Sequence, residues 1–140
     1  MTAETFVGEY LQQVASMANN RGVFPTPVFV LQGPALTFIA VADSPEVMTA
    51  VVDKEMRDPK VEMVAFGFDR TTLPDQGTAL GNVFTYAVAI RGDGVRYGVV
   101  EYDKGNVPPA REVDEDTFWG ARMRFEVNEA LPGLVEFAGV

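Results

Sequence analysis

Residues 83–102 read VFTYAVAI-RGDG-VRYGVVEY, and this stretch decides the fold. Two runs of β-branched and aromatic residues flank a Gly-Asp-Gly tip, which is the pattern of a β-hairpin. In the first run, large side chains alternate with small ones, and nearly all of them are apolar. A strand that is apolar on both faces belongs in the middle of a sheet that is covered on each side.

The position of the turn determines which side chains of the two runs share a face. A turn at Gly92-Asp93 and a turn at Asp93-Gly94 give the same face assignment, because the two registers differ by a whole alternation. Both registers predict that Val95, Tyr97 and Val99 share a face of the sheet with the large residues of the first run. The small residues of the first run are predicted to share the other face with Arg96, Gly98 and Val100.

Two helices are predicted on the N-terminal side of this hairpin. The first runs from about Ala3 to Asn19, with Thr2 as its cap and an apolar stripe at helical spacing formed by Phe6, Tyr10, Val14 and Met17. The second begins at Asp43-Ser44-Pro45-Glu46, where a capping residue, a proline and an early carboxylate coincide. It ends at Asp58-Pro59. Its predicted buried stripe consists of Val47, Met48, Val51, Val52 and Met56.

Three more strands are predicted between these elements. Residues 28–31 and 36–41 form a hairpin around the turn at 32–35, and residues 61–68 form the third strand. Pro25 and Pro27 cannot donate ladder hydrogen bonds, so we expect the first strand to lie near a sheet edge.

The segment from Trp119 to Val127 can be read in two ways. Apolar and polar residues alternate in it, and on a helical wheel the same apolar residues scatter around the circumference. The alternation favours a strand. A terminal helix beginning near Asp116 is the alternative.

The order of elements is α-β-β-α-β-β-β-(β) in a single globular domain that spans residues 1–140. This order predicts the α+β class, with a mostly antiparallel sheet of five to six strands and two main helices. It is similar to the element order of the roadblock, longin and profilin-like folds. That resemblance implies a small scaffold used in protein–protein contacts.

Composition excludes several kinds of chemistry. The chain has no cysteine and no histidine, which excludes disulfides, thiolate catalysis, iron–sulfur clusters and histidine general bases. The net charge of −9 argues against direct nucleic-acid and anionic-membrane binding. With no predicted leader or membrane span, we expect a cytoplasmic protein without a cofactor. Its small size and lack of motifs are compatible with a phage or mobile-element origin.

Carboxylates at predicted strand ends are the candidate metal ligands. If the strand ends converge, Mg²⁺ or Ca²⁺ could be held by oxygen ligands alone. The candidates are Asp43, Asp69, Glu101 and Asp103. The tripeptide Arg91-Gly92-Asp93 matches a cell-adhesion sequence, but a hairpin tip requires Gly and Asp for its backbone angles.

A tryptophan flanked by arginines has the composition of a binding hot spot, and an acidic run precedes it. The candidate partner-binding residues are Trp119, Arg122, Arg124, Asp114, Glu115 and Asp116. The sequence therefore favours a non-enzymatic interaction or structural module that binds a protein partner or self-associates. One alternative is an acidic inhibitor or nucleic-acid mimic, with Glu101, Asp103 and Glu112 extending the acidic face. The other alternative is a metal-dependent enzyme.

Overall fold

A computed structural model describes residues 2–21, 26–42, 45–71, 82–102, 111–114 and 117–139, with side chains described for 2–17, 28–34, 37, 46–68, 83–100, 112–114 and 117–139. The class is α+β, as predicted. Six strands form one antiparallel sheet in the order β2-β1-β3-β4-β5-β6. The strands are β1 (Thr26–Gln32), β2 (Ala35–Ala42), β3 (Val61–Thr71), β4 (Asn82–Ile90), β5 (Gly94–Tyr102) and β6 (Arg111–Val113).

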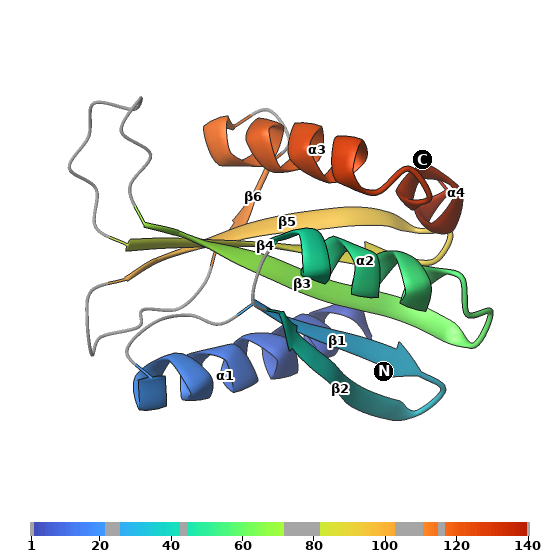
Figure 1. The fold of residues 1–140 in the computed structure, drawn as a ribbon, viewed down its shortest axis with the longest axis horizontal. Helices are drawn as coiled ribbons and strands as arrows, with labels where there is room; N and C mark the ends of the chain where they lie inside the picture. Colours follow the sequence, from blue (N-terminus) through green and yellow to red (C-terminus); the bar gives the residue numbers. More distant parts are fainter. Residues whose placement is uncertain are drawn as a thin grey trace.

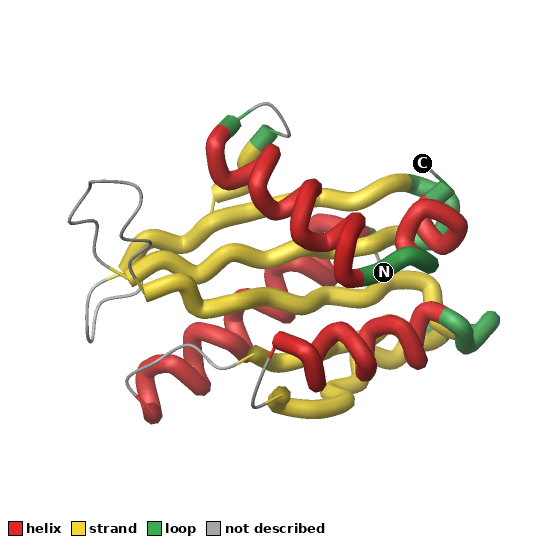
Figure 2. The backbone as a smooth tube through the Cα atoms, turned by 45° about the horizontal axis from the view of Figure 1, so that its top comes forward, coloured by secondary structure: helices red, strands yellow, loops and turns green. Residues whose placement is uncertain are grey.

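The sheet is the middle of three layers (Figures 1 and 2). One face is covered by α1 (Ala3–Arg21), and the other by α2 (Pro45–Met56), α3 (Phe118–Ala130) and the short α4 (Leu134–Ala138). Each face has its own apolar core. The sequence prediction that β4 is covered on both sides is therefore confirmed, and all residues from Val83 to Ile90 are buried.

The face assignment of the hairpin was wrong. Ile90 pairs with Gly94, so the loop is Arg91-Gly92-Asp93, with three residues instead of two. An odd loop reverses the alternation of the second strand relative to the first. Val95, Tyr97 and Val99 therefore share a face with the small residues of β4, and Arg96, Gly98 and Val100 share a face with the large ones.

The observed register matches large side chains with small ones. Gly98 pairs with Tyr86, and a Cβ atom at Gly98 would overlap the Tyr86 ring. A Cβ atom at Gly67 of β3 would likewise overlap the Phe84 ring. Both glycines thus lie beneath aromatic rings of β4 on the α1 face. A shift of one residue in either pairing would place side chains where only hydrogen atoms fit, so these contacts fix the register.

Helix α1 forms as predicted. The Thr2 hydroxyl accepts a hydrogen bond from the Thr5 backbone N–H at 3.2 Å, which caps the helix. Phe6, Tyr10 and Val14 are fully buried on the sheet. In α2, Met48, Val52 and Met56 are buried, but Val47 is 50% exposed. Including Val47 in the buried stripe was therefore wrong.

The two edges of the sheet are β2 and β6, so β1 lies near an edge, as predicted, but is not itself the edge strand. β1 lies between β2 and β3. Its register with β3 covers Phe29 to Gln32, whereas Pro27 pairs with Val41 of β2. Pro27 thus lies in the part of β1 that pairs with the edge strand β2, outside the part that pairs with β3. An interior strand can accommodate a proline at such a position.

The strand predicted for Trp119 to Val127 was also wrong, because the segment forms helix α3, as the alternative proposed. The Thr117 hydroxyl accepts a hydrogen bond from the Gly120 backbone N–H at 3.2 Å and caps the helix. Gly120, Met123 and Val127 form its buried stripe. The sixth strand is instead Arg111–Val113, beside Tyr97–Val99 of β5.

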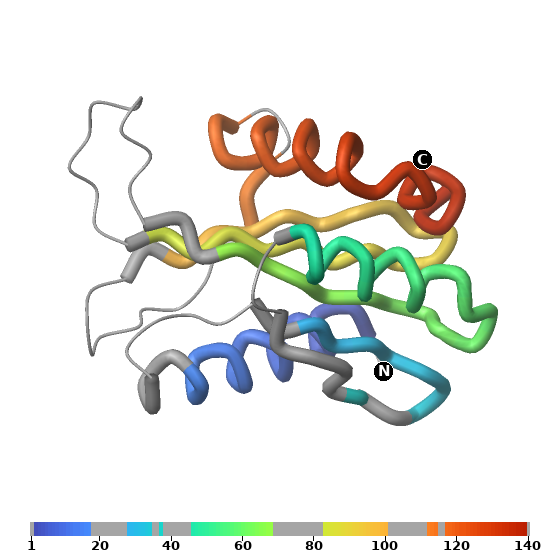
Figure 3. Tube along the Cα trace, in the orientation of Figure 1, coloured from blue at the N-terminus to red at the C-terminus, as the bar shows by residue number. Residues whose placement is uncertain are grey.

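Figure 3 traces the C-terminal segment back along the sheet to the loop of the central hairpin. There the Gly92 N–H donates to the Phe137 carbonyl at 2.9 Å. Gly92 has φ +70°, a conformation that glycine adopts without strain. The hairpin predicted from sequence is thus the element against which the end of the chain is fixed.

Candidate functional site

The outer face of α3 carries two exposed aromatic side chains. Phe118 is 48% exposed and Phe125 is 64% exposed. They are seven residues apart, so they lie two turns apart on one side of the helix. The buried stripe of Gly120, Met123 and Val127 occupies the opposite side. No rotation of the helix could bury the two phenylalanines without exposing this stripe.

Charged residues border this aromatic face. Arg122 pairs with Glu126 through Nε and Oε1 at 3.1 Å, and both side chains are about one-third exposed. Arg124, Glu129 and the preceding Asp114 are exposed. The outer face of α3, hereafter the α3 face, therefore consists of Phe118, Ala121 and Phe125 with a border of both charge signs.

The predicted partner-binding residues lie on or beside this helix, with two exceptions. Trp119 and Arg122 are half-buried, whereas Arg124 and Asp114 are exposed. The Trp119 ring meets the Phe118 ring edge-on, with centroids 4.9 Å apart. Glu115 and Asp116 lie outside the described residues. Sequence reasoning selected the tryptophan, whereas Phe125 is the most exposed aromatic residue among the described side chains.

The predicted acidic face includes a residue that forms an ion pair within the chain. Arg96 bridges Glu4 of α1 at 3.0 Å and Glu112 of β6 at 3.3 Å. A backbone hydrogen bond and the Arg96 guanidinium hold the pKa of the Glu4 carboxyl below its usual value. Of the acidic residues proposed for a mimic, Glu112 and Asp114 have described side chains, and Glu112 contacts this arginine.

The predicted metal ligands are not tested by the described side chains. Asp43 and Asp103 lie outside the described residues. The backbones of Asp69 and Glu101 pair with Phe84 and Val83 of β4, but their side chains lie outside the described set. Among side chains that the structure describes, no group of three carboxylates is arranged to hold a metal ion.

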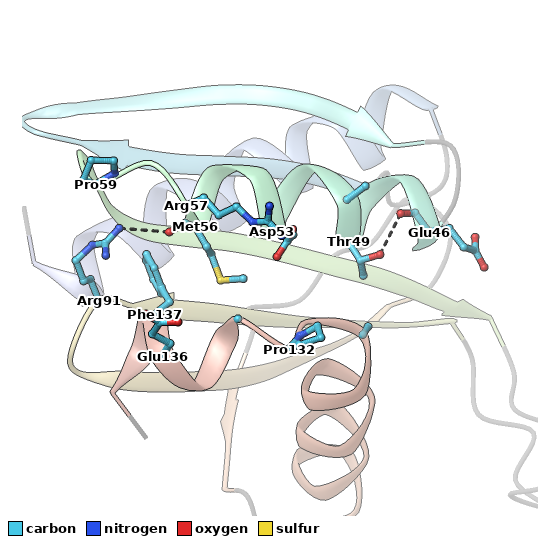
Figure 4. Close-up of a pocket in the computed structure, with 13 residues that line it drawn as sticks. Glu46, Thr49, Asp53, Met56, Arg57, Pro59, Arg91, Pro132, Glu136 and Phe137 are labelled. Carbon is cyan, nitrogen blue, oxygen red and sulfur yellow. Dashed lines mark hydrogen bonds and ion pairs between the residues drawn. The ribbon is translucent and has the colours of Figure 1, made fainter.

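A cleft of about 780 Å³ lies between α2 and the C-terminal segment (Figure 4). Thr49 and Asp53 of α2, with Arg57 just after the helix, line one wall, and Phe137 with Arg91 of the hairpin loop lines the other. Asp53 and Arg57 form an ion pair at 2.9 Å. The cleft therefore has charged groups of both signs, and its arginine on the hairpin side is engaged by the protein itself.

Arg91 connects three segments of the chain. Its Nε donates to the Val61 carbonyl at 2.8 Å, and its Nη2 donates to the Asp58 carbonyl at 2.9 Å and to the Met56 carbonyl at 3.5 Å. Its guanidinium lies over the Phe137 ring, 4.5 Å from the centroid. The Met56 carbonyl is at the end of α2, where helix carbonyls need donors. The RGD tripeptide is thus a hairpin loop whose arginine joins α2, β3 and α4.

Comparison of the chain with protein-family models, with curated proteins and with solved structures found no match in any of the three. In the part of the chain that is described, no helix is both long and apolar enough to cross a membrane. The geometry of the chain itself is therefore the basis for a functional proposal.

Proposed function

We propose that this protein is a non-enzymatic interaction module that binds a partner protein through the α3 face. The observation that carries the proposal is the exposure of Phe118 and Phe125 on the side of α3 opposite its buried stripe. The exposed parts of the two rings add no packing to the core of this chain, and aromatic residues are enriched in the centres of protein interfaces.

The spacing of this face indicates how it would bind. Phe118, Ala121 and Phe125 occupy positions i, i+3 and i+7, which are the anchor positions of a helix lying in an apolar groove. Both rings can enter such a groove together because they lie along one line of the helix. The partner is therefore expected to present an apolar groove long enough to accept two turns of α3.

Charge selects among proteins that have such a groove. The chain carries a net charge of −9, and the acidic residues Asp114 and Glu129 are exposed at either end of α3. A basic border around the groove would attract this surface, and the attraction would weaken as salt is added. We therefore propose a partner with an apolar groove bordered by lysine and arginine.

The test is partner capture with matched variants, followed by measurement with the purified partner. The variant Phe118→Ser/Phe125→Ser removes the aromatic anchors. The control Val135→Ser removes an apolar side chain of α4 that is 49% exposed and lies outside the α3 face. Thermal unfolding of each purified variant establishes that it is folded.

We expect the double variant to bind the purified partner at least tenfold more weakly, because buried aromatic anchors contribute about 2 kcal/mol or more each. Val135→Ser is expected to bind the partner like the unmodified protein. Added salt is expected to weaken partner binding by Val135→Ser and by the unmodified protein. Equal binding by the folded double variant and the control would show that the α3 face is not the docking surface.

A further inference from the structure

The two edges of the sheet are protected very differently. β6 is three residues long, and two of these are the charged residues Arg111 and Glu112. β2 is eight residues long with the sequence ALTFIAVA, which contains no charged residue and no proline. Within the described ranges, β2 pairs with β1 on one side, and no strand pairs with it on the other. Natural proteins normally blunt such an edge with charges, prolines or a covering segment.

The distribution of charge makes this edge unusual within the chain. The sequence contains no charged residue from Gly22 to Ala42, although it carries 20 acidic and 11 basic residues elsewhere. Two copies of a protein with net charge −9 repel each other, and that repulsion is smallest where neither surface carries charge. The uncharged β2 edge is thus a place where a second copy can approach at low electrostatic cost.

A β-bulge divides β2 into two parts. Val28 pairs with Ala40 and Phe29 with Phe38, which leaves Ile39 as the extra residue. Pairing with β1 is regular from Ala35 to Phe38, next to the turn. Thr37 lies within this regular part, and its side chain is half-buried. The bulge bends the strand beyond this point, so the regular part is where a further strand can pair.

We infer that β2 pairs with β2 of a second copy of the chain, antiparallel about a two-fold axis near Thr37. An antiparallel strand edge is self-complementary, because each copy offers the same alternating N–H and C=O groups. The outcome is one continuous sheet that passes through both copies. This inference concerns a surface at the other end of the sheet from α3 and does not depend on the proposed partner.

The test is the native mass of the full chain, measured by light scattering over a wide range of concentration and salt. The variant Thr37→Lys places a lysine of each copy beside the two-fold axis. The control Thr49→Lys makes the same change of net charge on α2, where Thr49 bonds the Glu46 carbonyl within its own helix. Phe118→Ser/Phe125→Ser serves as a second control for the α3 face.

We expect the unmodified chain, Thr49→Lys and the α3 variant to form dimers, and Thr37→Lys to remain monomeric at concentrations at least tenfold higher. Salt is expected to strengthen the dimer, because it screens repulsion between like-charged copies. This is the opposite of the effect expected for a basic partner at the α3 face. A monomeric unmodified chain under every condition, or an unchanged dimer of Thr37→Lys, would overturn the inference.

Amide hydrogen exchange of the unmodified chain provides a measurement that does not depend on how Thr37→Lys folds. Dimer formation should slow exchange in β2 as the protein concentration rises, while exchange in β6 stays the same. Concentration-independent exchange in β2 would also overturn the inference.

Discussion

Replacing Arg91 by alanine should destabilise the protein by about 2–3 kcal/mol, although the residue is exposed. The variant loses two short hydrogen bonds, from Nε to the Val61 carbonyl at 2.8 Å and from Nη2 to the Asp58 carbonyl at 2.9 Å. Hydrogen bonds from charged donors contribute about 1.5–3 kcal/mol each, and the exposure of Arg91 lowers the contribution of these two to about 1 kcal/mol each. The contact with Phe137 adds about 0.5 kcal/mol.

Urea unfolding followed by circular dichroism measures this change. For a slope of about 2 kcal/mol per M, a loss of about 2 kcal/mol lowers the midpoint by about 1 M. Arg57→Ala is the matched control, because Arg57 lines the same cleft but is 78% exposed and forms an ion pair with Asp53 four residues away. Such a pair contributes about 0.5 kcal/mol or less.

The lysine variant separates charge from geometry. Arg91→Lys keeps the positive charge, but one ammonium group cannot reproduce the planar fork that reaches separate carbonyls. We expect it to recover less than half of the stability lost in Arg91→Ala. If Arg91→Ala and Arg57→Ala destabilise the protein equally and slightly, then Arg91 does not join α2, β3 and α4 in the way the distances indicate.

Three further measurements address the core. Gly98→Ala should destabilise the protein by about 1–3 kcal/mol, because its Cβ atom would overlap the Tyr86 ring. Gly8→Ala, which has open space around it in α1, should stabilise the protein by about 0.5–1 kcal/mol. Urea midpoints of the two variants that move in the same direction would contradict this. Tyr10→Phe should stabilise the protein by about 1 kcal/mol, because the buried Tyr10 hydroxyl has no hydrogen-bond partner among the described residues; a lower urea midpoint would refute it. Burial, with a smaller effect of Glu112, raises the pKa of Tyr86 to about 12, and burial also raises the pKa of Tyr10. The pKa of tyrosine in the unfolded chain is about 10. The stability that the neutral form of Tyr86 contributes is therefore complete below pH 10 and is lost as the pH rises through about 12. Ultraviolet titration should show this late ionisation, and Tyr86→Phe should reduce its amplitude.

The sequence predicted the parts of the fold in which apolar periodicity and capping chemistry agree. Helix α1 has both a Thr2 cap and a stripe of large residues, of which Phe6, Tyr10 and Val14 are buried as expected and Met17 is half-buried. The strand predicted at 61–68 is also confirmed as β3, and its side chains alternate between the two cores, with Met63 and Ala65 under α1 and with Val64 and Phe66 on the other side. These features depend on neighbours in the sequence, so the sequence alone contains them.

The errors arose where a distant contact determines the local structure. The turn at Arg91–Asp93 has three residues because Tyr86 needs Gly98 beneath it and Gly92 bonds the C-terminal segment. Neither requirement can be read from the turn itself. In α3, the exposed Phe125 and the buried Gly120 invert the usual relation between hydrophobicity and burial, so the alternation pointed to a strand. The same inversion identifies the α3 face once the helix is known.

The two proposed surfaces lie at opposite ends of the sheet, which has a consequence for binding strength. Helix α3 packs over β4 and β5, whereas β2 is the far edge strand (Figure 1). A two-fold axis that relates antiparallel strands runs perpendicular to the sheet, so a β2-paired dimer would carry its two α3 faces on the same side of the continuous sheet. If both proposals hold, the dimer can therefore bind two partner molecules at once. On a surface that carries the partner densely, bivalent binding is stronger than monovalent binding by roughly 10²–10⁴.

Thr37→Lys should therefore bind a soluble, monomeric partner with unchanged affinity per site but dissociate much faster from a dense partner surface. Surface plasmon resonance at low and high partner density measures both properties. Phe118→Ser/Phe125→Ser should instead lose binding at either density, because it lacks the docking residues themselves. Loss of per-site affinity in Thr37→Lys would mean that the β2 edge and the α3 face are coupled through the sheet. The proposal that these two surfaces act independently would then be wrong.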